Sequence, residues 1–303
     1  MVVRVFVCFV LSALALSGGL ASAAPRYSDW GNTTYFAAVN TPELEFANGI
    51  SKDGLTFYFQ RGNALANGED IWIAHRASTD APWDAPLRLP DTVNSAFNDR
   101  AAIESSDGHW LYLASNRPGG KGDFDLYVSW RQHTHDDLGW QAPVPLTSIN
   151  TVGFDSGPTV FEDEQTGTLV MYFVSNPAGS QNANVDIYRA IQMPDGSFGQ
   201  VETVSELNST ANEGRPYVRH DGLEIFFNSA RPGLGLTDIW VATRGSTAEP
   251  WSPPVLAPGI NTKFADNVPA LSWDGRTLYF SSNRSGSNGE IYYATRQKVH
   301  GKP

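Results

Sequence analysis

Cysteine is almost absent from this chain of 303 residues, and the single one, Cys8, lies in an apolar N-terminal segment. That segment has a charged start, a largely apolar run from Val5 to Leu20 and the small residues Ala21-Ser22-Ala23, an order typical of a secretory signal peptide. We therefore expect residues 1–23 to be cleaved and the protein to be periplasmic or secreted. The mature chain, 24–303, would contain no thiol or disulfide, so the burial of side chains must stabilise it.

Long apolar runs and basic residues are also scarce. No segment after the signal approaches the roughly twenty apolar residues that a membrane-spanning helix requires. Lys and Arg number 21 against 32 Asp and Glu, a formal charge of -11 that becomes -12 once Arg4 is removed with the signal. Nucleic acids and anionic membranes attract basic surfaces, so neither is an expected partner. We expect a soluble monomer.

What the chain does contain is one pattern repeated five times. In each copy an apolar residue precedes an Asn, a carboxylate follows the Asn by five positions, and an Asp follows it by thirteen. Successive copies are 53 to 58 residues apart. A repeat of this length along the whole chain indicates copies of one supersecondary unit. The Asn residues are Asn40, Asn94, Asn150, Asn208 and Asn261.

Each copy predicts four strands. In the last complete copy, residues 268–273 and 277–281 flank Asp274-Gly275, a strong signal for a hairpin turn, and residues 290–294 form a third strand. A fourth, outer strand is expected after an aromatic residue that lies ten or eleven positions before the next Asn. These aromatic residues are Trp83, Trp140, Phe198 and Trp251.

The two chain ends are predicted to meet in one blade. The final copy has no fourth strand of its own, but Trp30 precedes Asn40 by ten positions, as Trp251 precedes Asn261. We therefore assign residues 33–39 as the outer strand of the last blade, which closes the ring. The expected fold is all-β, a single five-bladed β-propeller with four antiparallel strands per blade. An open solenoid would need capping units, and none is visible.

Two segments also resemble a known family. Ser115-Asn116-Arg117-Pro118-Gly119-Gly120, which leads into Asp125-Leu126-Tyr127, and the stretch from Ser272 to Arg284 are similar to repeats of TolB-like, WD40-like β-propeller proteins. The resemblance extends over all five copies and implies the propeller fold. It implies no single activity, because such propellers include periplasmic assembly proteins, peptidase domains and a few polysaccharide lyases.

The five carboxylates of the repeat are the first candidates for a site. We expect them near one mouth of the central channel, where the chain enters the innermost strand of each blade. A ring of oxygen ligands there suits calcium or another hard divalent cation, although no cofactor is certain. Two other roles stay open: capping of backbone N–H groups, and acid/base catalysis, with Asp99, Asp155 and Glu213 as candidates. The five are Glu45, Asp99, Asp155, Glu213 and Asp266.

Residues that break the repeat are better guides to a specific ligand. Positions six and seven after the Asn differ between copies and place Arg100 and Arg215 beside the carboxylates. Both belong to the predicted ligand-binding set, and Phe46, Ser156 and Asn267 are further positions of this kind. The loop arginines of three blades are expected to pair with third-strand carboxylates: Arg117 with Asp125, Arg231 with Asp238, and Arg284 with Glu290.

These features predict an exported propeller that binds a protein, a peptide or a saccharide at its acidic channel mouth without chemistry. The alternative is a carbohydrate-active hydrolase or lyase that uses two or three of the mouth carboxylates. Two carboxyl groups about 5 to 9 Å apart, in different environments, would favour the hydrolase. Carboxylates that all bond local backbone would argue against it.

Overall fold

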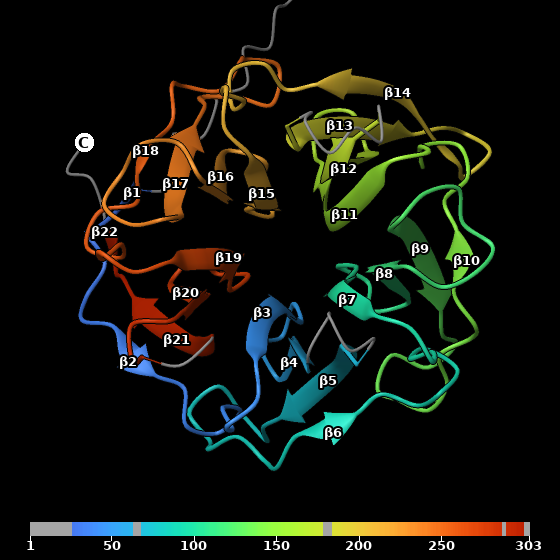
Figure 1. The fold of residues 1–303 in the computed structure, drawn as a ribbon, viewed down its shortest axis with the longest axis horizontal. Coiled ribbons are helices and arrows are strands. Elements are labelled where there is room, and N and C mark those ends of the chain that lie inside the picture. The colour runs from blue at the N-terminus through green and yellow to red at the C-terminus, as the bar shows by residue number, and fades with distance from the viewer. Residues whose placement is uncertain (1–25, 63–67, 178–183, 287–288, 300–303) are drawn as a thin grey trace, which may run out of the picture.

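The computed structural model describes residues 26–62, 68–177, 184–286 and 289–299. The predicted signal peptide, residues 1–23, lies outside these ranges. The regular elements of the described ranges are all β-strands, and they form five four-stranded antiparallel sheets around a central axis (Figure 1). The predicted five-bladed propeller is therefore confirmed. The described ranges contain no helix of the length and apolarity needed to span a membrane.

The blades follow one another in chain order, and each begins with its innermost strand. Blade 1 contains β3 (Glu45–Ile50), β4 (Thr56–Arg61), β5 (Asp70–His75) and β6 (Leu87–Arg88). Blade 2 contains β7 (Asp99–Glu104), β8 (Trp110–Ser115), β9 (Asp125–Trp130) and β10 (Val144–Pro145). Blade 3 contains β11 (Phe154–Asp163), β12 (Thr168–Asn176), β13 (Asp186–Gln192) and β14 (Phe198–Thr203). Blade 4 contains β15 (Glu213–Val218), β16 (Glu224–Ser229), β17 (Asp238–Thr243) and β18 (Val255–Leu256). Blade 5 contains β19 (Asp266–Leu271), β20 (Thr277–Ser282), β21 (Glu290–Thr295) and β2 (Thr34–Tyr35).

The N-terminal strand closes the ring in blade 5, as predicted. Strand β2 pairs with β21, with Thr34 opposite Tyr293. It is shorter than the predicted strand 33–39, because a turn follows in which Asn40 N–H donates to the Phe36 carbonyl. A second pair of strands, β1 (Arg26–Tyr27) and β22 (Lys298–Val299), also joins the two ends of the described chain and was not predicted.

The repeated Asn explains how each blade holds its outer connection. Asn94 Oδ1 accepts a hydrogen bond from Ile71 N–H, and its Nδ2 donates to the Ile71 carbonyl, over 2.8 and 3.0 Å. The amide thus pairs with the third strand of the preceding blade as a strand neighbour would. Equivalent pairs link Asn40 with Ile291, Asn150 with Leu126, Asn208 with Ile187 and Asn261 with Ile239.

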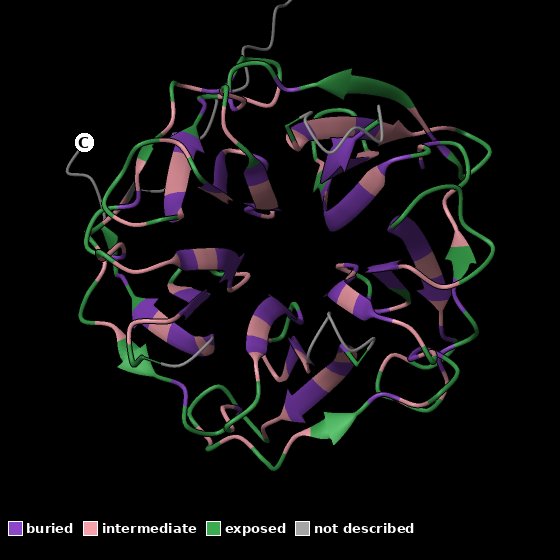
Figure 2. Ribbon diagram, viewed as in Figure 1, coloured by how far each residue is buried: buried purple, intermediate pink, exposed green. Residues whose placement is uncertain are grey.

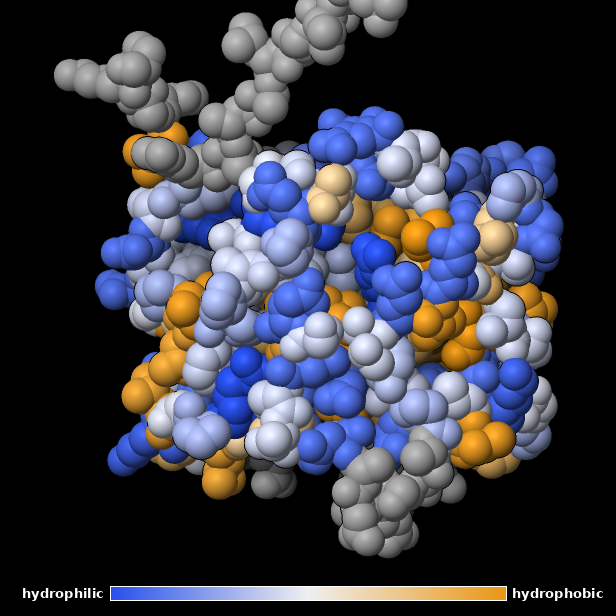
Figure 3. All heavy atoms as spheres, turned by 90° about the horizontal axis from the view of Figure 1, so that it is seen from above, coloured by the Kyte–Doolittle hydropathy of each residue, from blue (hydrophilic) through white to orange (hydrophobic). Residues whose placement is uncertain are grey.

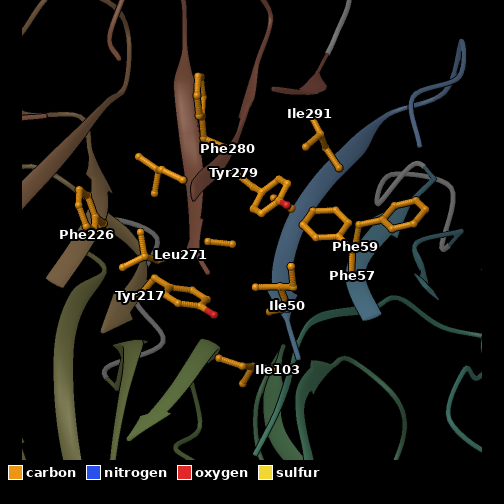
Figure 4. Packing of buried hydrophobic residues seen from close by; sticks show 14 of the residues in the cluster. Ile50, Phe57, Phe59, Ile103, Tyr217, Phe226, Leu271, Tyr279, Phe280 and Ile291 are labelled. Carbon is orange, nitrogen blue, oxygen red and sulfur yellow. The ribbon is translucent and has the colours of Figure 1, made fainter. Parts of the chain in front are cut away.

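The innermost strands are mostly buried and the outermost strands mostly exposed (Figure 2). Side chains from the innermost strands meet at the axis, where Ile50, Ile103, Tyr217 and Leu271 converge (Figure 4). With Val160 they line a cavity of only about 30 Å³, at the end of the channel where the hairpin turns lie. The side chains therefore leave little free space at this end of the channel.

The edge of the disc is largely hydrophilic, with separate apolar patches between polar ones (Figure 3). Leu138 and Leu236 are the most exposed of the large apolar residues described, at 78% and 82%. Scattered apolar residues of this kind are normal on a soluble surface.

Candidate functional site

The five repeat carboxylates lie at the start of the innermost strands, each no more than 2% exposed. Each caps the turn by which the chain enters its strand. In blade 5 the backbone N–H and the hydroxyl of Thr262 donate to Asp266 Oδ2 over 2.6 and 2.8 Å. Ser95 does the same for Asp99 in blade 2, over 2.5 and 2.8 Å. A Thr or Ser four positions earlier also bonds the carboxylate in the other blades: Thr41 with Glu45, Thr151 with Asp155, and Ser209 with Glu213.

Four of these carboxylates also form an ion pair with an arginine of their own blade. Antiparallel pairing sets Asp99 opposite Ser115, so the loop arginine two residues further on, Arg117, lies over the start of the innermost strand. The remaining pairs are Arg61 Nε with Glu45 Oε1 at 3.0 Å, Arg231 Nη2 with Glu213 Oε1 at 2.8 Å, and Arg284 Nη2 with Asp266 Oδ1 at 2.5 Å.

The predicted partners of the loop arginines were therefore wrong. The ion pairs lie within one blade, as expected, but they involve the innermost strand rather than the third. The third-strand carboxylates bond their own loops instead: Asp125 accepts from Lys121 and Gly122 N–H, Asp238 from Leu234 and Gly235 N–H, and Glu290 from the Ser285 hydroxyl.

Blade 3 lacks the arginine because Pro177 stands in its place. There the Ser175 hydroxyl donates to Asp155 Oδ1 over 2.5 Å. Burial raises the pKa of Asp155 above its usual range, and the hydrogen bonds from Ser175 and Thr151 oppose this rise. Burial raises the pKa of Glu45 in the same way, against its bonds to Thr41 and Arg61.

The structure does not gather the five carboxylates around one point. Each is bonded to its own turn, and four are neutralised by their own arginine. In the part of the chain that the structure describes, no three His, Cys, Asp or Glu side chains are arranged to hold a metal ion. The geometry thus gives no support to a shared calcium site, and it favours the capping role for Glu45, Asp99, Asp155, Glu213 and Asp266.

Arg215 is the residue that crosses the channel. From the innermost strand of blade 4, its Nη1 donates to Asn48 Oδ1 over 3.0 Å and its Nη2 to Gln60 Oε1 over 2.5 Å, both in blade 1. Blade 5 separates these two blades in the ring (Figure 1). A bulge between Gly214 and Tyr217 gives Arg215 a positive φ of 37° and turns its side chain inward.

This positive φ recurs at the same place in four innermost strands. Ala101, Gly157 and Val268 have φ values of 57°, 64° and 51°. Side chains other than glycine adopt this region at a cost of about 1 kcal/mol or more. A Cβ at Gly157 would lie 3.2 Å from Arg215 Cδ, so glycine there leaves room for the arginine.

Arg100 lies beside the same channel on blade 2. Its guanidinium carbon is 3.6 Å from the centre of the Phe124 ring, and its Nη1 is 3.5 Å from Glu69 Oε2. Glu69 also accepts a hydrogen bond from Gln60 Nε2 over 2.9 Å. Gln60 therefore links Arg215 to the pair of Glu69 and Arg100.

Sequence reasoning found Arg100 and Arg215 but missed Glu69, Asn48 and Gln60. A signal for Glu69 did exist. It directly precedes the third-strand carboxylate, where the other copies have Phe124, Val185, Thr237 and Gly289. A buried carboxylate at a position that is otherwise uncharged breaks the repeat as clearly as the two arginines do.

Several buried polar atoms at this level of the channel have no hydrogen-bond partner among the described residues. They are Asn48 Nδ2, Glu69 Oε2, Arg100 Nε, Ser156 Oγ and Asn267 Oδ1. Buried polar groups in folded proteins are normally bonded, and each exception needs an explanation. We call the set formed by Asn48, Gln60, Glu69, Arg100, Ser156, Arg215 and Asn267 the mouth cluster.

The mouth cluster holds more positive than negative charge. Burial lowers the pKa of Arg100 and of Arg215. The nearby charge of Arg100 lowers the pKa of Arg215 further, and Glu69 opposes both shifts. A guanidinium remains protonated at neutral pH, so the two half-buried cations are held beside one buried carboxylate, Glu69, with the exposed Asp123 also acting on Arg100.

No family model and no curated protein matches the sequence. Solved structures share its fold. A thermostable family-43 glycoside hydrolase is 13% identical with a TM-score of 0.60, over 89% of this chain and 94% of the other. An endo-arabinase from Bacteroides thetaiotaomicron VPI-5482 is 15% identical with a TM-score of 0.59, over 88% and 98% of the two chains. A GH43_1 enzyme from Xanthomonas citri, complexed with xylose, is 16% identical with a TM-score of 0.57, over 88% and 94%.

These likenesses define the class of protein as a five-bladed β-propeller, and at such identities they show the fold alone. A putative TolB from Agrobacterium tumefaciens is 16% identical with a TM-score of 0.48, over 89% of this chain and 97% of the other. The TolB-like resemblance stays a prediction from the sequence motifs.

Proposed function

We propose that this protein is a carbohydrate-active propeller that binds a saccharide at the mouth cluster. The observation that carries the proposal is the set of unbonded polar atoms of the mouth cluster, near the start of the innermost strands. Asn48 Nδ2 and Arg100 Nε are donors, Glu69 Oε2 and Asn267 Oδ1 are acceptors, and Ser156 Oγ can do either. Sugar hydroxyls donate and accept hydrogen bonds, so a saccharide can satisfy this mixed set where a purely apolar ligand cannot.

The structural neighbours support the saccharide over the protein or peptide partner that the sequence left equally open. Their names describe an arabinase and an enzyme complexed with xylose. Phe46, half-buried in the same innermost strand as Asn48, adds an aromatic ring, and aromatic rings pack against the apolar faces of sugars. Export of the protein remains a proposal, and sequencing the N-terminus of the secreted product tests it.

A double variant, Ser156→Ala with Asn267→Ala, tests this function directly. Ser156 Oγ and Asn267 Oδ1 have no partner within the described residues, so their removal should leave the unfolding free energy within about 1 kcal/mol of wild type. Saccharide affinity, measured by titration calorimetry against a panel of oligosaccharides, should fall several-fold. The matched control is Asn32→Ala with Ser205→Ala, at exposed positions. Unchanged affinity in the mouth variant would contradict the proposal.

Glycoside hydrolysis is the second candidate, and Glu69 is the observation that favours it. Hydrolysis needs two carboxyl groups in different environments. The repeat carboxylates are bonded internally, but Glu69 is buried beside Arg100, and the exposed Asp123 lies close enough for its charge to act on Arg100. Glu69→Gln should abolish product formation while the saccharide still binds. A wild-type protein that binds saccharides but releases no reducing ends would exclude hydrolysis.

A further inference from the structure

We infer that the saccharide bound at the mouth cluster is acidic, and that Arg100 and Arg215 bind its carboxylate. This inference rests on the proposed function and names the class of its ligand. Uronic-acid oligosaccharides are the class that combines a carboxylate with ring hydroxyls.

The positive charge of the mouth cluster exceeds its negative charge, so an anionic ligand would balance it. Arg100 and Arg215 share one carboxylate of the cluster, Glu69, at 3.5 Å from Arg100, and the exposed Asp123 outside the cluster acts on Arg100 alone. Among the described residues, the hydrogen bonds of the Arg215 guanidinium go to neutral amide oxygens, those of Asn48 and Gln60. Two half-buried cations beside a single cluster carboxylate repel each other, and a bound carboxylate would offset the repulsion between the two guanidinium groups. The overall charge of -11 makes this positive site an exception within the protein.

The unbonded donors lie beside the same two arginines. Arg100 Nε has no acceptor among the described residues, and neither has Asn48 Nδ2, whose own Oδ1 is bonded to Arg215. Nitrogen donors next to two cations match the oxygen atoms of a carboxylate. Arg100 keeps 16% of its side chain exposed, so an anion from solvent can reach it.

Other arginines at the channel mouth form ion pairs with a carboxylate of their own blade. Arg231 and Arg284 each lie within 2.8 Å of a buried carboxylate of the innermost strand. They use the repeat acid of their own blade, whereas Arg100 and Arg215 occupy positions where the repeat supplies none. The two arginines are therefore not required by the blade structure.

The test compares ligands that differ only in charge. Tetramers of glucuronate, mannuronate and galacturonate are titrated by calorimetry, each beside its fully methyl-esterified form. The acid of at least one sugar should bind about tenfold or more tightly than its ester, because charge-assisted hydrogen bonds are lost on esterification. The affinity for the acid should also fall as salt is raised.

Two single variants identify the residues. Arg100→Gln removes one charge; Arg215→Asn removes the other with a residue that tolerates positive φ. Each should weaken binding of the acid about tenfold and leave binding of the ester within about twofold. Arg88→Gln, which alters an arginine on the outer strand of blade 1, should change neither. Thermal melts confirm folding, and if Arg215→Asn fails to fold, Arg100→Gln decides alone.

The outcomes separate this inference from the proposed function. Equal affinity for acid and ester, or variants that weaken both ligands alike, would overturn the acidic ligand but leave saccharide binding intact. Tighter binding of the ester would overturn it too. If none of the tetramers binds in either form while neutral oligosaccharides do, the inference is likewise wrong. Failure of every saccharide, acidic and neutral, would overturn the proposed function itself.

Discussion

Removing the charge of a repeat carboxylate should destabilise the fold by an amount set by its arginine. Asp99 is fully buried, accepts two hydrogen bonds from Ser95, and forms an ion pair with Arg117, whose side chain is 14% exposed. Asp99→Asn leaves Arg117 without a counterion and sets an amide against N–H donors. Breaking a buried pair in this way costs about 3 to 5 kcal/mol. For a domain of this size the melting temperature should fall by roughly 10 °C.

Blade 3 supplies a comparison within the same protein. Asp155 occupies the equivalent position and bonds Thr151 and Ser175, with no arginine in its ion-pair range among the described residues. Asp155→Asn should therefore cost less, about 1 to 3 kcal/mol, because only hydrogen bonds are lost. Asp91→Asn is the surface control: its side chain is 91% exposed, and its pair with Arg88 should contribute under about 1 kcal/mol.

Chemical denaturation followed by tryptophan fluorescence measures all three free energies. The expected order of destabilisation is Asp99→Asn first, Asp155→Asn second and Asp91→Asn last. If Asp99→Asn is as stable as the surface control, the carboxylate does not hold the blade and the capping role is refuted. If Asp99→Asn and Asp155→Asn are equally destabilised, the uncompensated arginine is not the dominant cost.

Three further predictions concern the rest of the fold. Burial raises the pKa of Glu104 to about 7, against the opposing effects of Arg131 and of the Tyr58 hydroxyl. Because the pKa of Glu104 is higher in the folded state than in the unfolded state, the protonated group adds to the free energy of unfolding. This contribution is complete below the unfolded pKa and is lost as pH rises through about 7. Between about pH 5 and about pH 8 the free energy of unfolding of the wild type should thus fall by up to roughly 3 kcal/mol relative to that of Glu104→Gln. Parallel pH profiles of the two unfolding free energies would contradict this. Asn94→Ala removes the bonds that hold the Ile71 backbone and should cost about 2 to 4 kcal/mol, measured by denaturation; a loss under about 1 kcal/mol would show that water replaces the amide. Deleting residues 33–39 removes β2 from blade 5 and should sharply lower the melting temperature, so an unchanged melt would argue against closure by this strand.

The repeat made the architecture predictable because its signals are local. An Asp-Gly turn, an Asn before the innermost strand and an aromatic residue before the outer strand each act within a few residues of their own blade. Five copies of the same local signals permit few arrangements that bury the faces of every sheet. Trp30, ten positions before Asn40, shows which strand completes the last blade. The bulge that gives Arg215 its positive φ carries no such signal, because Ala101 and Val268 adopt the same conformation with different side chains.

The sequence by itself determined five blades, their strand order and their closure, and it marked Arg100 and Arg215 as departures from the repeat. It could not decide which way the repeat carboxylates face, because that depends on an arginine placed opposite them only when two strands pair. Only the tertiary structure placed Arg215 against Asn48 and Gln60, which lie 167 and 155 residues away along the chain. Contacts across the channel join blades that are not neighbours, and no local pattern encodes them. The same ring closure that the repeat predicts is what brings these side chains together.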